Sequence, residues 1–226
     1  MNLHTTSKDR LLAALEGCYE ATRAAALSGV PVSTVYHWAR KGIVVPTVSS
    51  VRTKYWSYAD LMALRIVYWL RHPKVGESRN IPASPMGQVR EALKRLDRLG
   101  LDIWAEEYSG SSPLQVDPSG DIHIVTRGLV ETVKRQLVMG EVLDLLAPFA
   151  TRDGSGPDLI RPRPLLRIIP GKVSGEPHLM NSRITTKAVA ALYERLGDVE
   201  VVSDLYPGQE MQAVAEAIDL ERSLAA

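Results

Sequence analysis

The strongest constraint on the fold is a break of four residues, Ser28-Gly29-Val30-Pro31, between two segments that favour helix. An Ala-rich segment from Glu20 to Leu27 precedes the break, and the segment VSTVYHWAR follows it at once. Glycine supports the C-terminal cap of a helix, and proline cannot continue one because it lacks the amide hydrogen. The pattern predicts two helices joined by a tight turn, with Val32 or Ser33 as N-cap of the second and Gly42 closing it.

The composition is that of a globular protein. The 226 residues are 45% hydrophobic and 23% charged, enough for one large domain or two to three small ones. The single cysteine, Cys18, excludes a disulfide within the chain and a site of several thiolates. The N-terminal residues show neither a secretory leader nor an apolar run of membrane-spanning length, so we expect a cytoplasmic protein.

Charge is distributed unevenly along the chain. Residues 1–75 contain 10 basic and 4 acidic residues, a net charge of +6. Residues 76–150 have a net charge of −3 and residues 151–226 a net charge of −2. A phosphate backbone is attracted to cationic surface and repelled by anionic surface. We therefore expect any nucleic acid to bind the first third of the chain.

The remaining elements are predicted from hydrophobic spacing and from turn residues. Ile43–Val45 and Val51–Trp56 read as a short hairpin or wing, and Ser57 as the cap of a helix from Tyr58 to Arg71. The middle of the chain is predicted to contain a helix over Met86–Leu99, short strands in LDIWAEEY (101–108), the hairpin LQV-DPSG-DIHIV, a strand in LVETV, and a helix from about Leu137 to Ala147.

The C-terminal part is predicted to be a small helical domain. Thr151–Pro164 has the composition of a linker, and LLRII at 165–169 reads as extended. Three helices are predicted after it: Thr186–Leu196 with Val189, Leu192, Tyr193 and Leu196 inward, Val199–Leu205, and Gln209–Leu224 with Met211, Val214, Ala215 and Ile218 inward.

These elements predict an α+β protein that is mainly α. We expect a winged helix-turn-helix domain at 1–75, an α/β middle region with a hairpin at 76–150, a linker at 151–164 and a three-helix domain at 165–226.

The helix after the break has an apolar side and a polar side. Val35, Trp38 and Ala39 share one arc and are expected to face the core. The opposite side carries hydrogen-bond donors of the kind that read bases or hold phosphates in a DNA major groove. The candidate DNA-binding residues are Ser33, Thr34, Tyr36, His37, Arg40 and Lys41, together with Arg52 and Lys54 in the wing. The alternative is a solvated face of a small helical bundle.

Two segments near this helix carry a family resemblance. VSTVYHWARKGIVVP followed by KYWSYADLMALRIVYWLR resembles the winged helix-turn-helix of MerR-type DNA-binding proteins over about residues 19–71. The resemblance implies a recognition helix that ends in a Lys-Gly pair. This chain has Tyr36 where the MerR pattern has an arginine, and the long dimerisation helix of that family is not evident, so neither an operator preference nor an effector is carried over.

The C-terminal segment carries a second resemblance. Residues 174–224 are similar to the small DUF433 domain in a Gly175/Pro177 step, in Arg183-Ile184-Thr185 before a helix, and in Tyr206-Pro207. A MerR-like module followed by such a domain resembles the VapB-type antitoxins of type II toxin–antitoxin systems, whose partners are PIN-domain ribonucleases of the VapC type. The exposed side of the last helices has no basic residue among its predicted members, which are the acidic Glu200, Asp204, Glu210, Glu216 and Asp219 and the neutral Gln209 and Gln212, so we expect protein rather than DNA there.

Catalysis and cofactor binding find no support in the residues. The five histidines show no paired metal-ligand spacing, and no glycine-rich phosphate loop is present. Ser174, Glu176 and His178 lie close in sequence but without a nucleophile elbow. We therefore predict no catalytic residues, no metal and no cofactor. Trp38, Trp56 and Trp69 fall at apolar positions and are predicted to be core.

The linker arginines Arg161 and Arg163 suggest a toxin contact. A carboxylate cluster that holds metal in a PIN-domain ribonuclease can be neutralised by an arginine from an extended arm. The alternative for these two residues is plain solubility.

The sequence thus favours an antitoxin that binds its operator as a homodimeric autorepressor and neutralises a PIN-domain ribonuclease. A stand-alone MerR-like transcriptional regulator without a toxin is the alternative. An enzyme is disfavoured because no catalytic constellation is visible.

Overall fold

The computed structural model divides into two compact units that are mainly helical with small antiparallel sheets, and it belongs to the predicted α+β class. One unit combines residues 1–62 with residues 147–226, and the other contains residues 63–146. The chain leaves the first unit within helix α4 (Tyr58–Arg71), which was predicted with these bounds. The structure describes residues 7–75, 80–99, 114–117, 119–126, 129–132, 141–142, 147–151 and 155–225.

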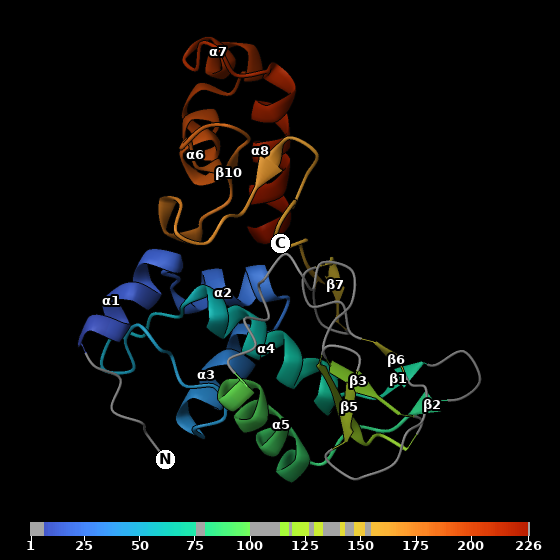
Figure 1. Cartoon of the computed structure of the whole chain (residues 1–226). Coiled ribbons are helices and arrows are strands. Elements are labelled where there is room, and N and C mark those ends of the chain that lie inside the picture. Colours follow the sequence, from blue (N-terminus) through green and yellow to red (C-terminus); the bar gives the residue numbers. More distant parts are fainter. Residues whose placement is uncertain are drawn as a thin grey trace. The chain divides into compact units, whose positions relative to one another are not determined.

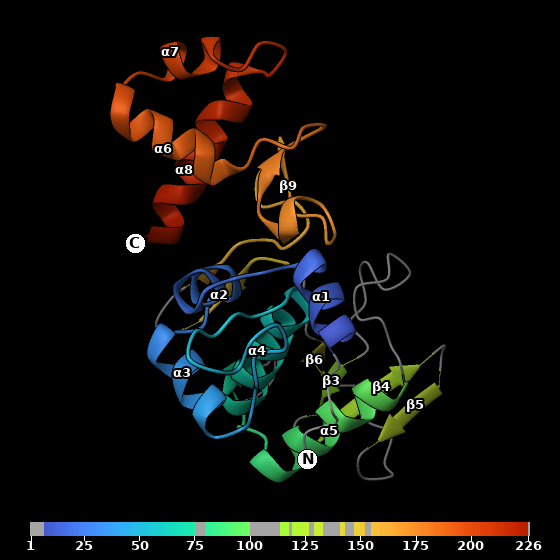
Figure 2. The same cartoon turned by 90° about the vertical axis from the view of Figure 1, so that its left-hand side faces the viewer.

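The first unit begins with three helices, shown in blue in Figures 1 and 2. Helices α2 (Ala21–Ser28) and α3 (Val32–Arg40) flank the predicted break, whereas α1 (Ser7–Glu16) was not predicted. Gly29 ends α2 with a φ of 71°, and a Cβ at this position would lie 2.5 Å from the amide nitrogen of Gly156. Both the left-handed backbone and the close approach therefore require glycine at the break.

The N-terminal end of α3 differs from the prediction, and its C-terminal end agrees with it. The N-cap is Pro31 rather than Val32 or Ser33, because the Pro31 carbonyl already accepts the amide of Thr34 at 2.9 Å. At the other end Lys41 is the C-cap, and Gly42 follows with a φ of 63°. Glycine therefore closes the helix as predicted.

Helix α4 begins with a reciprocal cap. The Asp60 amide donates to the Ser57 hydroxyl at 3.2 Å, and the Ser57 amide donates to the Asp60 carboxylate at 2.8 Å. The same carboxylate accepts the amide and the hydroxyl of Thr47 at 2.8 and 2.7 Å. Asp60 thus fixes the loop after α3 to the start of α4, and the prediction that Ser57 caps this helix is confirmed.

The second unit places helix α5 beside a four-stranded antiparallel sheet in the order β5-β4-β3-β6. The predicted hairpin is confirmed: β3 pairs with β4, with Gln115 opposite His123. The hydroxyl of Ser84, ahead of α5, donates to the Gly120 carbonyl in the hairpin turn at 2.7 Å. The elements are β1 (Lys74–Val75), β2 (Asn80–Ile81), α5 (Met86–Leu99), β3 (Leu114–Val116), β4 (Ile122–Thr126), β5 (Leu129–Thr132) and β6 (Glu141–Val142).

The helix predicted from about Leu137 to Ala147 is wrong where the structure describes it. Glu141 and Val142 form strand β6, which pairs with β3 through Val116 and Gln115. Pairing with an existing strand edge outweighs the local preference for helix here. The rest of that helix lies outside the described residues, as does the strand predicted in residues 101–108.

The segment predicted as a linker is partly packed. Strand β8 (Ser155–Gly156) pairs with β7 (Phe149–Ala150), and Leu159 is fully buried. The carbonyl of Leu159 accepts the Tyr58 hydroxyl at 2.9 Å. These contacts add the described residues of this segment to the first unit, which composition alone did not indicate.

Three helices close the first unit around an apolar core. They were predicted with nearly the observed bounds, and Figure 1 shows them in orange and red together with strand β10. Buried Val189, Val202 and Val214 come one from each helix. The elements are β9 (Leu166–Arg167), the 3-10 turn η2 (Val173–Gly175), β10 (His178–Leu179), α6 (Thr186–Leu196), α7 (Val199–Asp204) and α8 (Met211–Ala225).

Three side chains of these helices differ from the prediction. Leu196 and Met211 were expected inward, but they are 46% and 53% exposed because each is the terminal residue of its helix, beyond the reach of the neighbouring helix. Glu216 was expected outside but is 8% exposed, because its carboxylate accepts the Leu165 amide at 2.8 Å. The buried Glu216 carboxylate thus provides a hydrogen-bond acceptor for a backbone amide.

None of the helices in the described part of the chain is long and apolar enough to cross a lipid bilayer.

A buried imidazole lies at the start of the C-terminal helices. His178 has no solvent exposure; its Nδ1 donates to the Glu176 carbonyl at 3.0 Å, and its Nε2 has no hydrogen-bond partner. Burial lowers the pKa of His178 below its ordinary value, with Lys172 and Arg167 adding to the effect. The ring is therefore held in its neutral form.

We expect the free energy of unfolding to fall as the pH drops below about 6.5, because the unfolded chain then binds a proton that the folded ring excludes. The contribution of one such group is at most about 1.4 kcal/mol per pH unit. Urea denaturation at pH 7.5 and 5.5 measures the difference, and His178→Asn should reduce it. The exposed His37→Asn is the control; a His178→Asn variant with the wild-type pH dependence would contradict the assignment.

Candidate nucleic-acid interface

The outer face of α3 is exposed and rich in donors. Ser33, His37 and Arg40 are exposed, as are Tyr36, at 42%, and Lys41. Thr34, also predicted for this face, is half-buried. Because the N-cap is Pro31 and makes no side-chain cap hydrogen bond, the Ser33 hydroxyl is not used for capping.

The inner face of α3 is apolar, as predicted. Val35 is fully buried, Trp38 is 6% exposed, and Ala39 is half-buried. Trp56 is also fully buried, and its backbone exchanges two hydrogen bonds of 2.9 Å with Tyr19 ahead of α2. The prediction that Trp38 and Trp56 belong to the core is confirmed. The apolar side of the helix thus packs into the core, while Ser33, His37 and Arg40 on its polar side are exposed.

The charges around α3 have one sign. Between Glu20 and Asp60 the sequence contains no acidic residue, and Asp60 is buried against the loop after α3. Arg40 and Lys41 at the end of α3 are exposed. A polyanion that approaches this face therefore meets Arg40 and Lys41, and this stretch of the chain adds no exposed carboxylate beside them.

The wing differs in detail from the predicted hairpin. Ile43–Val45 is not a strand, because the Ile43 amide donates to the Trp38 carbonyl at 2.9 Å to end α3. Instead Ser49 pairs with Tyr55 through two backbone hydrogen bonds. Arg52 at the tip of this loop is exposed, and the ammonium group of Lys54 donates to the Val51 carbonyl at 3.3 Å.

Tyr36 links α3 to the strand-like end of the wing. Its ring meets the Trp56 ring edge to face, with centroids 6.2 Å apart and an interplanar angle of 82°. Such a pair fixes the orientation of an aromatic side chain while part of it remains exposed. The position where MerR-type proteins have arginine is therefore occupied by a ring with a defined packing partner.

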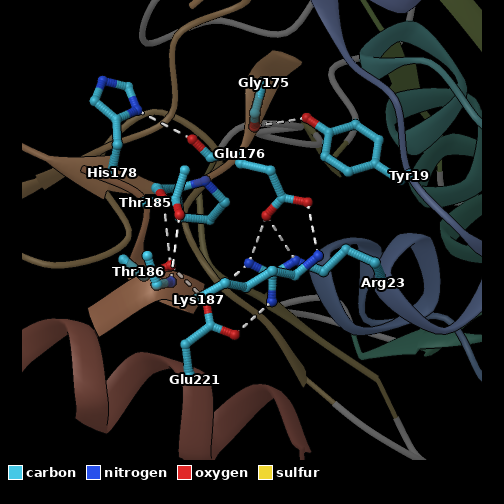
Figure 3. Close-up of polar contacts among 11 residues, drawn as sticks. Tyr19, Arg23, Gly175, Glu176, His178, Thr185, Thr186, Lys187 and Glu221 are labelled. Carbon is cyan, nitrogen blue, oxygen red and sulfur yellow. Dashed lines mark hydrogen bonds and ion pairs between the residues drawn. The ribbon is translucent and has the colours of Figure 1, made fainter. Parts of the chain in front are cut away.

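An arginine on α2 ties the α2–α3 pair to the C-terminal helices of the same unit (Figure 3). Arg23 is 8% exposed and donates to Glu176 at 3.0 and 2.8 Å and to Glu221 at 2.8 Å through two nitrogens. Burial acts to lower the pKa of Arg23, but the hydrogen bonds and charges of both glutamates raise it above its ordinary value. Sequence reasoning missed this residue.

Further polar contacts complete the Arg23 anchor. The Thr186 hydroxyl donates to Glu221, and the Lys187 ammonium group donates to Glu176 at 3.0 Å. The Tyr19 hydroxyl donates to the Gly175 carbonyl at 2.7 Å. Figure 3 shows these side chains coming together from α2 and the residues before it, from α6 and α8, and from the loop after η2. Because each buried charge is paired, α2 is held firmly behind α3.

The Gly175 position explains part of the DUF433-like pattern. Its φ is 71°, and a Cβ would lie 2.2 Å from the Tyr19 hydroxyl and 2.6 Å from the Glu16 carbonyl oxygen. Pro177, the other member of that pattern, offers its carbonyl to the amide of Thr186 at 2.9 Å. Both residues therefore serve the packing within this unit.

The linker arginines occupy different environments. Arg161 is exposed, and its backbone amide is bound by the Asp158 carboxylate at 2.5 Å. Arg163 forms an ion pair with Asp219 of α8 at 2.8 Å. The structure therefore does not bring the two guanidinium groups to one shared contact, and only Arg161 is exposed.

Reactive groups are few in the described residues. No group of three His, Cys, Asp or Glu side chains there is arranged to hold a metal ion. Burial, Glu176 and Glu20 raise the pKa of the half-buried Cys18 thiol, which lowers its thiolate fraction at neutral pH.

We expect Arg23→Ala to lower the free energy of unfolding by about 3 to 5 kcal/mol, because it leaves two poorly exposed carboxylates without their cation. Chemical denaturation of the full chain measures the loss. The matched control is Arg195→Ala, which removes an exposed arginine of α6 and should change stability by less than about 0.5 kcal/mol. Equal effects of the two variants would contradict the anchor.

Comparisons with known proteins name no family for this chain. No protein-family model matched it, and neither did any curated protein or solved structure. The resemblances to the MerR-type and DUF433 domains therefore rest on the residues quoted for them, and the function is argued from those residues and from the geometry around α3.

Proposed function

We propose that this chain is the DNA-binding antitoxin of a type II toxin–antitoxin system. In this proposal α2 and α3 form a helix-turn-helix, α3 is the recognition helix, and the loop closed by Ser49 and Tyr55 is the wing. The protein binds its own operator as a cytoplasmic homodimer and represses transcription. It also neutralises a PIN-domain ribonuclease.

One observation supports the DNA-binding part above all others: α3 buries Val35 and Trp38 while it exposes Tyr36, His37 and Arg40. A helix that enters a major groove needs a firmly held apolar side and a free side of donors. The alternative is that this side of α3 is simply a solvated face of a helical bundle. Such a face normally carries acidic as well as basic residues. Here the sequence has no acidic residue between Glu20 and Asp60.

Roles on the exposed face follow from side-chain chemistry. Arg40 has the planar fork that binds O6 and N7 of guanine, and His37 and Ser33 can donate to base edges about one and two turns earlier. Thr34, Lys41 and the wing residues Arg52 and Lys54 suit the phosphates on either side. A single module of this size binds weakly, so a homodimer on a two-fold operator is proposed.

The toxin-binding part is supported by the resemblance to VapB-type antitoxins. Within the described residues, Arg161 is exposed and remains the better candidate for an arm that reaches acidic groups of a ribonuclease. Arg163 is held by Asp219 and would have to leave that ion pair to make the same contact. A stand-alone transcriptional regulator would use the same α3 surface and would lack this partner.

For Arg40→Ala we expect operator binding to weaken by about 1 to 3 kcal/mol if the guanidinium reads a base, with relaxed specificity at one position. Lys41→Ala should instead weaken binding to all DNA sequences alike. It should also reduce the slope of log binding constant against log salt concentration by about one. Titration of the fragment upstream of the gene at several salt concentrations separates the two effects. Arg195→Ala serves as the control, and an unchanged titration for both α3 variants would count against α3 as the recognition helix.

Co-expression with the neighbouring open reading frame tests the toxin. We expect a stable complex that loses ribonuclease activity, and we expect Arg161→Ala to restore part of that activity because a charged contact is removed. Arg163→Ala should have the smaller effect, since Arg163 is already paired. A neighbour that forms no complex, with intact operator binding, would favour the stand-alone regulator.

A further inference from the structure

Helix α1 has its leucines on the outside. Leu11, Leu12 and Leu15 are 62%, 51% and 55% exposed, whereas Ala13 and Ala14 are half-buried. A surface helix normally does the opposite, with its large apolar side chains against the core. At about 100° per residue the three leucines lie within an arc of about 100°, with Ala13 on the other side of the helix. They therefore form one continuous apolar stripe.

The orientation of α1 is fixed by its C-terminal end. The Glu16 carbonyl accepts the Gly171 amide at 3.3 Å, and the Cys18 amide donates to the Ser174 carbonyl at 3.2 Å. Gly175 packs against the same carbonyl of Glu16, where no side chain would fit. These contacts of α1 are thus made by the backbone at its C-terminal end, while each leucine of the stripe is more than half exposed.

The charges of α1 run against its own dipole. The first turn contains Lys8 and Arg10 with Asp9, a net charge of +1, and the last residue of the helix is Glu16. A helix on its own is stabilised by the reverse order, with anions first and cations last. A second helix in the antiparallel direction would bring opposite charges to both ends.

We propose that α1 packs antiparallel against α1 of a second copy of this chain. Lys8 lies four residues before Leu12 and Glu16 four residues after it, so a two-fold axis at Leu12 places Lys8 at the same level as Glu16 of the second copy. The leucine stripes then cover each other, as apolar stripes do in paired helices. A parallel pair would instead set Lys8 against Lys8.

Other occupants fit the stripe less well. A membrane surface attracts a helix with cations along its polar side, whereas α1 has two basic and two acidic residues and spans only 10 residues. An unrelated partner would not need charges that are symmetric about one leucine. Self-complementarity is the property expected of a surface that binds its own copy through a two-fold axis.

The position of α1 connects this surface to the proposed function. Only residues 17–20 separate α1 from α2, so pairing of two α1 helices would constrain the distance and direction between two α3 helices. The inference deepens the homodimer of the proposed function, but the α1 interface itself requires neither DNA nor toxin.

Charge reversal tests the arrangement, with sedimentation equilibrium of the full chain as the measurement. The wild-type chain should be dimeric at micromolar concentration. Lys8→Glu and Glu16→Lys should each raise the dimer dissociation constant by about tenfold or more, because two symmetry-related pairs become repulsive at once. The double variant Lys8→Glu/Glu16→Lys should restore the wild-type constant. A monomeric wild-type chain, or a double variant weaker than both single variants, would overturn the proposal.

A second variant separates the interface from folding. Leu11→Gln/Leu15→Gln should give a monomer with an unchanged urea midpoint, since the stripe is outside the core. If this variant has the same mass in solution as the wild-type chain, the proposal is overturned. A lowered urea midpoint with the dimer still intact would also overturn it, because the leucine stripe would then be covered by residues of its own chain. Operator titration tests the proposed function separately. If the chain binds DNA but charge reversal leaves its mass unchanged, only the α1 interface is refuted. If the chain dimerises through α1 but binds no DNA, only the proposed function is refuted.

Discussion

The first unit depends most on the ion pairs that the Arg23 guanidinium makes with two glutamates. The guanidinium reaches Glu176 across 153 residues of sequence and Glu221 across 198, and all three side chains are nearly excluded from water. A buried cation is tolerated only when its donors and the opposing carboxylates are satisfied together. Here Lys187 binds the Glu176 oxygen that Arg23 does not reach, and Thr186 adds a hydrogen bond to a Glu221 oxygen that Arg23 also binds. The first and last parts of the chain therefore fold as one body.

This anchor also shapes the electrostatics of the proposed DNA-binding face. Arg23 lies one helix away from α3, but its charge is neutralised by two carboxylates and contributes little outward field. The field at the α3 surface is set instead by Arg40 and Lys41, which are exposed. The structure thus separates the cation that holds the scaffold from the cations that remain available to a polyanion.

Local signals in the sequence predicted the helices well and the long-range contacts poorly. The bounds of α4, α5 and α6 follow from hydrophobic period and caps, and so do the break at Gly29 and the two faces of α3. Arg23 gives no such signal, because an arginine in an Ala-rich helix looks like any solvated residue until its distant partners are known. Strand β6 was missed for the same reason, since its pairing with β3 is set by the sheet rather than by its own residues.

Helices α1 and α3 illustrate how far a helical pattern can be interpreted without coordinates. Both have large apolar side chains gathered on one side, and in a surface helix such a side normally packs against the core. In α3 this is the case, and the prediction that Val35 and Trp38 face the core is correct because both are buried. In α1 the large apolar side chains lie outside: Leu11, Leu12 and Leu15 are more than half exposed, and the helix is fixed at its C-terminal end, where Gly175 packs against the Glu16 carbonyl. The core of the first unit thus leaves these leucines exposed, and a second apolar surface is the simplest way to remove them from water.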